Sequence, residues 1–448
     1  MTNTIPPPFD HQTVTTRKLL ENPDVIITSD PGTGKTRSVV DAHAERRGKK
    51  LLVFAPLSIL QSSWGDDIDT FQPTMTYSIA YARNRQKAFE QDVDVVVTNH
   101  DAVKWVKENQ DLLIDFDTIV VDEFTAFKNK DAKRSKAMYS IRERFKNHII
   151  MSGTPNPNTV LDLWHPMMIC DGGERLGRKF YSFRGKVCTP VFNGFANEWV
   201  DKPDAQQIVA AAIMDINVRF ALEECIDMPE HNVYTIRVDL PASVMKAYKQ
   251  LSAESTVELT AGRLTTIHAG AKVKKLLQIC TGAVYNEDGE VIGVHDQRYD
   301  LVMELVQQRE HSLVAFNWKH ERDCLVKKAE ELGISYAVID GDTPVKERTN
   351  IVQKFQAGEI RVIFAHPQSA GHGLTLTRAT ATIWASPTYN SEHFQQFNRR
   401  IYRAGQKKRT ETILIAARGT WEPAVYAKLN TKLSRMDDLL NILSQTTE

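Results

Sequence analysis

Short, continuously apolar runs recur through the first third of the chain. Five of them, each bounded by turn residues, read DVIITSD, KKLLVFAP, DVDVVVTNH, DTIVVDE and HIIMSGTP. A strand that is buried on both faces of a sheet has such a continuous run, whereas a half-buried strand alternates apolar and polar residues. The segments between the runs are helical in composition. Alternating strands and helices predict right-handed crossovers and a parallel sheet, which is an α/β fold.

The same rhythm returns after residue 310, in HSLVAFNW, SYAVIDG, IRVIFAHP, ATIWASP and TILIAAR. The middle of the chain differs, because it mixes aromatic and basic residues with helical stretches such as ASVMKAYKQLSAEST and GAKVKKLLQIC. We therefore expect one lobe over residues 1–165, mostly helical insertions and a linker over 166–295, and a second lobe over 296–448.

Composition excludes several classes of protein. A length of 448 residues suggests two or three domains, and no apolar run approaches the roughly 18 residues of a membrane span. The N-terminus has no basic segment followed by an apolar one, and the five cysteines form no C-x-x-C pair. We expect a cytoplasmic protein. Since 56 basic residues balance 56 acidic ones, nucleic-acid binding would depend on local basic patches.

The first predicted strand leads directly into SDPGTGKT and then into a helical segment. Glycines permit a tight loop whose amides point at phosphate oxygens, and the helix N-terminus adds partial positive charge. Lys35 can reach the β and γ phosphates, and Thr36 can ligate Mg²⁺. Ser29 stands where the strict motif has its first glycine. The residues predicted to bind nucleotide here are Asp30, Pro31, Gly32, Thr33, Gly34, Lys35 and Thr36.

Two further turns follow predicted strands. Asp122 and Glu123 come directly after IVV, where one carboxylate can hold Mg²⁺ and the other can orient the attacking water. Ligand sites of α/β sheets lie at such carboxyl ends of strands, which strengthens an otherwise common pair. Ser152 and Thr154, in MSGTPNPN, could sense the nucleotide from a neighbouring turn; the alternative is a turn without function.

Taken in order, DPGTGKT, DEFT, SGTP and QQFNRRIYRAGQ resemble a superfamily II helicase. The spacing within QFNRRIYRAGQ is similar to the Swi/Snf-type branch, as are LLVFAPLSILQSSW, KLLQIC, SAGHGLTL and GTWEPAVYAKL. The resemblance spans residue 12 to about residue 430. It implies two RecA-like parallel-sheet lobes that bind ATP in the cleft between them and DNA across both.

The resemblance also implies roles for individual residues. Gln12 would read adenine, although a surface glutamine is the alternative. Gly373 and Gln396 would contribute to the nucleotide site. The residues placed at DNA are Pro56, Ser58, Thr98, Ser152 and Thr154 in the first lobe, with Ser369 and Gly371 in the second. The sequence departs from the family pattern at Thr125, Ala370, Thr375 and Arg399. These departures bear on how tightly hydrolysis is coupled to DNA, and not on hydrolysis itself.

Three arginines lie close together near the C-terminal end. Arginines supplied from a second lobe would stabilise the charge that develops during phosphoryl transfer. Arg400 and Arg403 are spaced i, i+3, which on a helix places them on one face, whereas Arg399 points about 100° away. We therefore expect Arg400 and Arg403 to be catalytic, together with Lys35, Asp122 and Glu123.

A basic, aromatic stretch, RLGRKFYSFRGK, occupies residues 175–186. It could bind a DNA backbone through Arg178 and Lys179 while its aromatic residues stack on bases. An amphipathic segment with its aromatic residues in the core is an equal alternative. Trp318 and Trp384 follow or end predicted strands and are expected in the core.

These observations predict a DNA-stimulated ATPase that uses ATP and Mg²⁺ to translocate on duplex or branched DNA, as in branch migration or fork reversal. We expect a monomeric motor in the cytoplasm of a bacterial or phage-infected cell. Its protein partners remain open. The alternatives are a conventional strand-separating DNA or RNA helicase and an ATP-driven remover of DNA-bound proteins. A scaffold without catalysis is disfavoured because every charged catalytic position is present.

Overall fold

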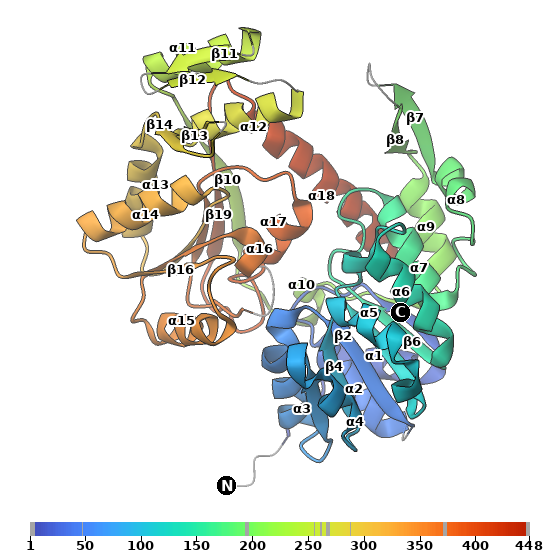
Figure 1. The fold of residues 1–448 in the computed structure, drawn as a ribbon. Helices are drawn as coiled ribbons and strands as arrows, with labels where there is room; N and C mark the ends of the chain where they lie inside the picture. Colours follow the sequence, from blue (N-terminus) through green and yellow to red (C-terminus); the bar gives the residue numbers. More distant parts are fainter. Residues whose placement is uncertain are drawn as a thin grey trace. The chain divides into compact units, whose positions relative to one another are not determined.

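The chain divides into two compact units. The computed structural model describes residues 5–46, 48–192, 197–254, 256–259, 262–265, 269–286, 288–370 and 374–444. One unit comprises residues 1–227 together with 432–448, and the other comprises residues 228–431. Figure 1 shows the first unit mainly in blue and green and the second mainly in yellow and orange.

The first unit is built on a seven-stranded parallel sheet with the order β3-β4-β2-β5-β6-β1-β9. Its strands are β1 (Asp24–Ile27), β2 (Lys50–Ala55), β3 (Tyr77–Ala80), β4 (Val95–Asn99), β5 (Phe116–Asp122), β6 (Asn147–Met151) and β9 (Asn217–Val218). All five runs predicted from the apolar pattern are strands of this sheet. β3 and β9 were not predicted, because β3 is buried only at alternate residues and β9 has two residues.

Helices cover both faces of this sheet. Val25 and Ile27 pack into one apolar cluster, whereas the intervening Ile26 packs into the other, which explains why the strands are apolar at every position. The helices are α1 (Asp10–Glu21), α2 (Lys35–Arg46), α3 (Asp66–Phe71), α4 (Arg85–Glu90), α5 (Val103–Glu108), α6 (Lys133–Ile141), α7 (Trp164–Asp171), α8 (Phe180–Val187), α9 (Ala205–Ile213) and α10 (Leu222–Cys225).

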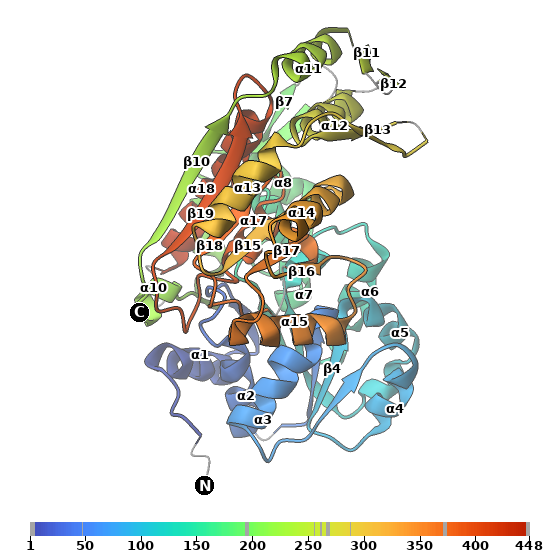
Figure 2. The same ribbon diagram turned by 90° about the vertical axis from the view of Figure 1, so that its left-hand side faces the viewer.

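The second unit contains a six-stranded parallel sheet with the order β10-β19-β18-β15-β17-β16. Its strands are β10 (His231–Val238), β15 (Ser312–Ala315), β16 (Tyr336–Ile339), β17 (Val362–Ala365), β18 (Ala381–Trp384) and β19 (Thr410–Ala417). The five predicted runs are again strands. β10, which was not predicted, is an edge strand with mostly exposed residues, and Figure 2 shows it running alongside β19. The predicted fold class, two RecA-like parallel-sheet lobes, is confirmed.

The helices of the second unit are α11 (Ala242–Glu254), α12 (Ala269–Cys280), α13 (Gln297–Gln307), α14 (Lys319–Glu331), α15 (Val345–Ala357), α16 (Pro367–Ala370) and α17 (Ser391–Asn398). The last helix, α18 (Glu422–Ser444), begins in the second unit and ends in the first. Leu439 and Leu443 of α18 belong to one apolar cluster of the first unit. Among the described residues, no helix combines the length and apolar character that a membrane crossing requires.

The middle of the chain contributes strands to both sheets. β9 pairs with β1, and β10 pairs with β19. Three hairpins accompany the helices of this region: β7 (Cys188–Phe192) with β8 (Asn197–Asp201), β11 (Thr256–Leu259) with β12 (Gly262–Thr265), and β13 (Ala283–Tyr285) with β14 (Val291–Gly293). The chain passes from one compact unit to the other after residue 227 and again after residue 431. The sequence-based prediction instead set residues 166–295 apart as a middle region.

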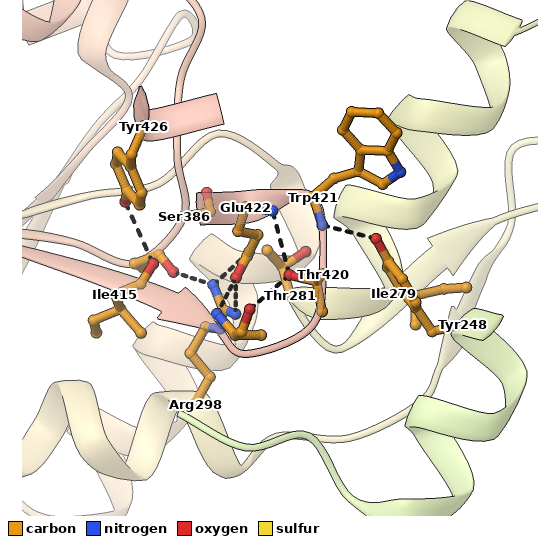
Figure 3. A network of polar contacts seen from close by, with 12 residues as sticks. Tyr248, Ile279, Thr281, Arg298, Ser386, Ile415, Thr420, Trp421, Glu422 and Tyr426 are labelled. Carbon is orange, nitrogen blue, oxygen red and sulfur yellow. Dashed lines mark hydrogen bonds and ion pairs between the residues drawn. The ribbon is translucent and has the colours of Figure 1, made fainter. Parts of the chain in front are cut away.

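A buried ion pair fixes the start of α18 within the second unit. Both oxygens of Glu422 accept from Arg298 of α13, at 2.9 and 2.6 Å, and one of them also accepts from the amide of Ala417. Arg298 donates in addition to the carbonyl of Ala385. Figure 3 shows this network, in which both oxygens of Glu422 and both terminal nitrogens of Arg298 are hydrogen-bonded. This ion pair gives the glutamate of the GTWEPAVYAKL segment a structural role.

Candidate nucleotide-binding site

The phosphate loop lies between β1 and α2 at the carboxyl edge of the first sheet. Gly32 and Gly34 have φ angles of 92° and 80°, which side chains other than glycine rarely adopt. α2 begins at Lys35, whose ammonium donates to the carbonyls of Ser29 and Asp30 at 2.9 and 3.0 Å. These contacts hold the lysine over its own loop, where a phosphate could take the place of the carbonyls.

Gln12 of α1 packs directly against this loop. Its amide nitrogen donates to the carbonyl of Thr33 at 3.2 Å, and its amide oxygen accepts from the backbone N–H of Phe9 at 3.0 Å. The approach is so close that a Cβ on Gly34 would lie 2.2 Å from the Gln12 amide nitrogen. Gln12 is buried, so the alternative of a surface glutamine is wrong. Its role in reading adenine stays a prediction.

A pocket of about 800 Å³ opens beside Gln12. Phe9 and His11 stack in it with ring centroids 5.7 Å apart, and His11 also contacts the ring of Phe220. The imidazole of His11 lies 2.8 Å from the Thr33 carbonyl, which joins the pocket to the phosphate loop. An aromatic wall next to a phosphate-binding loop is suited to a flat heterocyclic base.

The segment that contains β9 braces the phosphate loop. Arg219 donates to one carboxylate oxygen of Asp30 at 2.7 Å and to the carbonyl of Thr28 at 2.9 Å. The other oxygen of Asp30 accepts from the backbone of Leu222 at 3.1 Å. The hydroxyl of Ser29, the residue in place of the usual glycine, accepts from the amide of Phe220. The unusual side chains of this loop therefore connect it to the last strand of the sheet.

Asp122 is the last residue of β5 and is buried. One carboxylate oxygen accepts from the indole N–H of Trp64 at 3.0 Å, and the backbone carbonyl lies 2.7 Å from the imidazole of His100. Burial raises the pKa of Asp122 well above its usual range, and the nearby charge of Glu123 raises it further. Burial also lowers the pKa of Lys35, although these carboxylates counteract that effect.

Glu123 has a left-handed backbone conformation, with φ 52° and ψ 58°. This is uncommon for a residue with a side chain, and such strain tends to occur at functional sites. Its carboxylate accepts from the hydroxyl of Ser152 at 2.7 Å, and that hydroxyl accepts in turn from the amide of Thr154. The turn after β6 therefore orients the second carboxylate.

The turn after β6 also touches the phosphate loop. A Cβ on Gly153 would lie 2.6 Å from Cδ of Pro31, so only glycine permits this approach. The turn after β6 thus contacts both the loop after β1, through Gly153 with Pro31, and the turn after β5, through Ser152 with Glu123. The structure brings together the predicted nucleotide and carboxylate residues of the first unit.

Three predicted DNA contacts are placed differently. Thr98, Ser152 and Thr154 are buried, so their side chains cannot contact a DNA backbone in this structure. Thr98 instead donates to the carbonyl of Ala80 at 2.6 Å, within the sheet. Pro56 and Ser58 follow β2 and are half-buried, which leaves part of each side chain accessible.

The arginines of the second unit do not share a helix face. α17 ends at Asn398, so Arg400 and Arg403 lie in a turn and a bend, and the predicted helical spacing is wrong. They nevertheless converge, because each donates to the carbonyl of Leu374, at 3.3 and 3.2 Å. Arg399 instead places its guanidinium 5.4 Å from the ring centre of Tyr402.

The remaining predicted residues of the second unit differ in how deeply they are buried. Gln396 of α17 is buried, and its amide nitrogen lies 3.5 Å from the carboxylate of Glu392. Ser369 of α16 is half-buried, whereas Gly371 and Gly373 lie outside the described residues. Trp384 is in the core, as predicted, but Trp318 is only half-buried.

The basic stretch has both exposed and buried aromatic residues, and its contact with DNA stays a prediction. Arg178 and Lys179 are exposed, and so is Tyr181 of α8. Phe183 of the same helix is buried in the core of the first unit. One aromatic residue thus packs inward while another remains available at the surface.

Three residues of the site were not singled out from the sequence. Trp64 and His100 bind Asp122, and Arg219 binds Asp30. His100 is the last residue of one predicted strand segment and Trp64 follows another, but their partner lies in a different strand. No local pattern marks Arg219, because its partner lies 189 residues away in the chain.

Comparisons with known proteins agree with this architecture. Residues 13–283 match the SNF2-related domain, and residues 297–405 match the helicase conserved C-terminal domain. Protein p41 of Acyrthosiphon pisum secondary endosymbiont phage 1 is 27% identical over 480 aligned positions, which cover 98% of this chain and 99% of that protein.

Two longer relatives carry functional names. YwqA of Bacillus subtilis, named as an ATP-dependent helicase/translocase, is 24% identical over 444 positions, covering 94% of this chain and 47% of that protein. ZRANB3 of Bos taurus, named as a DNA annealing helicase and endonuclease, is 24% identical over 446 positions, covering 93% and 39%. The chain thus spans less than half the length of these two relatives.

Proposed function

Because the chain belongs to the SNF2-related family and is an ATP-hydrolysing helicase or translocase of that family, we propose that it moves along duplex or branched DNA and remodels branches. Such remodelling includes branch migration and fork reversal. The observation that carries this proposal is the contact of three loops at one sheet edge, which brings the phosphate loop, the carboxylate pair and the Ser152 turn together.

The proposed roles in the first unit follow from the chemistry of the side chains. Lys35 would place its charge on the β and γ phosphates, after exchanging its two loop carbonyls for phosphate oxygens. Glu123, held by Ser152, would orient the attacking water. Gln12 and the aromatic wall beside it would bind the adenine.

The donors in this region fit Mg²⁺. The Asp122 carboxylate has a pKa raised by burial and by Glu123, so a nearby cation would favour its ionised form. Mg²⁺ commonly uses one or two protein oxygens together with substrate phosphates and water. We propose that Asp122 and the hydroxyl of Thr36 hold it. When bound, the ion would neutralise charge on the phosphate oxygens.

The second unit would supply cations to the same phosphates. Arg400 and Arg403 both donate to the Leu374 carbonyl, so their guanidinium groups lie close together. Rotation of either side chain would turn its guanidinium toward a phosphate. An arginine that acts only when two lobes close makes hydrolysis depend on closure. Gly373 and Gln396 are proposed as further nucleotide contacts from this unit.

DNA is the proposed partner. The similarity to ZRANB3, named as a DNA annealing helicase and endonuclease, and to YwqA, named as a helicase/translocase, supports this assignment. In the first unit Pro56 and Ser58 would contact the backbone, with Arg178 and Lys179 adding exposed charge. Ser369 and Gly371 would do so in the second unit.

Stimulation of hydrolysis by different nucleic acids tests the proposal. ATP turnover would be measured with no nucleic acid, with single-stranded DNA, duplex DNA, a four-way DNA junction and duplex RNA. We expect the four-way junction and the duplex DNA to stimulate most strongly. Hydrolysis that none of these stimulates would contradict translocation on nucleic acid, and stimulation by RNA alone would change the partner.

A further inference from the structure

The β7–β8 hairpin of the first unit is anchored at the end where β7 begins and β8 ends. Near that end, Asp201 accepts from the thiol of Cys188 at 3.4 Å and from the backbone of Val160 at 3.3 Å. Lys202 also donates to the carbonyls of Gly185 and Lys186, which ties the hairpin to the end of α8. Figure 1 shows the two strands extending from this end, with α8 close to it.

The rest of the hairpin exposes apolar side chains. All residues of β7 after Cys188 are exposed, and Phe192 and Val191 expose 68% and 51% of their surface. An isolated two-stranded ribbon is only marginally stable in water, and exposed apolar surface usually marks an interaction site. Cys188 and Trp199 pack on the core of the unit, whereas Val191 and Phe192 remain exposed and available to a partner.

Aromatic rings and cations alternate beside the hairpin. The guanidinium of Arg184 lies 3.8 Å from the ring centre of Trp199 and 5.0 Å from that of Tyr181. Lys130 lies 5.3 Å from the ring centre of Phe180. Tyr181 exposes 69% of its surface. Cation–π contacts of this kind hold the rings in place while leaving their outer faces accessible.

The pairing of β7 with β8 extends this row of aromatic and basic side chains along the hairpin. Pro190 lies opposite Trp199, and Phe192 lies opposite Asn197. Because side chains alternate between the faces of a strand, Pro190 and Phe192 share the face on which Trp199 lies. Trp199, Pro190 and Phe192 therefore form a continuous apolar strip that begins at Arg184.

Charge in this region indicates an anionic partner. Residues 175–186 contain five basic residues and no aspartate or glutamate; Arg175 pairs with Asp171 and Asp215, and β8 itself carries Glu198 and Asp201, so the unpaired basic charge lies on and just before α8. Apolar partners such as a protein surface do not require such an excess, whereas a phosphate backbone does. Arg178, Lys179 and Lys186 are exposed and available to phosphates.

We propose that the β7–β8 hairpin and α8 bind an unpaired DNA strand at a branch point, with Tyr181 and Phe192 stacking on bases and the neighbouring cations contacting phosphates. This inference rests on the proposed function, since it assumes a branched DNA substrate. Exposed aromatic rings can stack only on bases that are not already covered in a duplex, so the surface distinguishes unpaired from paired DNA. The hairpin would thereby hold one strand where the duplex opens.

Binding measured without ATP tests the proposal directly. The double variant Tyr181→Ala with Phe192→Ala would be compared with the unchanged full chain by fluorescence anisotropy. The probes are a labelled oligothymidylate, a duplex with unpaired arms and a blunt duplex of the same length. We expect roughly 10-fold weaker binding of the first two probes, since stacking on two rings is lost, with no change for the blunt duplex. Both side chains are exposed, so the thermal unfolding temperature should not change.

Matched variants separate the alternatives. Tyr139→Ala with Ile114→Ala removes two exposed apolar side chains elsewhere in the first unit and should leave all three affinities unchanged. Equal weakening on the blunt duplex would show that the surface binds duplex backbone, and unchanged binding of every probe would show that Tyr181 and Phe192 do not contact DNA; either result overturns the proposal. The outcome is independent of ATP turnover, so it can be distinguished from a failure of the proposed translocase activity.

Discussion

The guanidinium of Arg219 lies 2.7 Å from the carboxylate of Asp30, although 189 residues separate them in the sequence. Both side chains are buried, and Asp30 is part of the phosphate loop. Arg219→Ala would leave the carboxylate buried without its cation. We expect a loss of about 3–5 kcal/mol in the free energy of unfolding of the first unit, measured by denaturant titration, together with a higher KM for ATP.

A double-mutant cycle checks whether the pair acts as a unit. Asp30→Asn combined with Arg219→Gln removes both charges, so neither charge is left unpaired in the interior. The double variant should lose clearly less stability than the sum of the two single variants. Additive losses would indicate that the two residues act separately.

Lys35→Ala should abolish hydrolysis and leave the fold intact. The ammonium makes two hydrogen bonds to loop carbonyls, and burial lowers its pKa, so its removal relieves a cost of burial. We expect ATP turnover to fall at least about 100-fold, with an unchanged circular dichroism spectrum. Lys146→Ala, at an exposed lysine of the same unit, is the control. Substantial remaining activity in the Lys35 variant would refute the phosphate-loop assignment.

Arg403→Ala should be far more damaging than Arg399→Glu. Arg403 shares the Leu374 carbonyl with Arg400, whereas Arg399 lies beside the ring of Tyr402. We expect Arg403→Ala to lower the DNA-stimulated kcat at least about 100-fold with little change in the affinity for ATP. Arg399→Glu should change kcat by less than about 5-fold, consistent with a surface charge. Equal effects of both changes would show that the arginines are not divided in this way.

The stability of the second unit should depend on pH through Glu321. This glutamate of α14 is fully buried; one oxygen accepts from Ser386 and from two backbone amides, and burial raises its pKa to about 7. An unfolded glutamate ionises near pH 4.3. Between these two values the unfolded chain binds fewer protons, so stability falls as pH rises, by on the order of 3 kcal/mol in total.

Glu321→Gln should remove this dependence, because the amide is neutral at every pH. The variant should therefore gain stability relative to the unchanged chain as pH rises from 5 to 7, in denaturant titrations at fixed ionic strength. Glu304→Gln, at an exposed glutamate of α13, should follow the unchanged chain. Parallel pH profiles for the Glu321 variant and the unchanged chain would rule out this glutamate as the cause.

The strands that position the site could be predicted because burial on both faces makes them continuously apolar. Val25, Ile26 and Ile27 illustrate this, since neighbouring residues enter opposite clusters. β10 could not be predicted, because it is a mostly exposed edge strand that mixes polar and apolar residues. The two residues of β9 are too few for any periodic pattern.

The arginine prediction failed for a tertiary reason. The sequence around Arg400 is compatible with a helix, but Asn398 accepts from the indole of Trp384, and the carbonyl of Arg400 accepts from the amide of Leu376. These contacts with other segments replace the next helical turn. Local spacing therefore predicted that Arg400 and Arg403 lie together, but not the geometry that joins them, and their catalytic role stays a prediction.

The first unit is discontinuous in the sequence, and this has a consequence for its folding during synthesis. Its core includes Leu439 and Leu443 of α18, whereas the second unit is one uninterrupted stretch from residue 228 to residue 431. Chains emerge from the ribosome at about 5–20 residues per second, and domains fold as units. The second unit can therefore fold while the first still lacks its last helix. The first unit, although its synthesis begins first, is completed last.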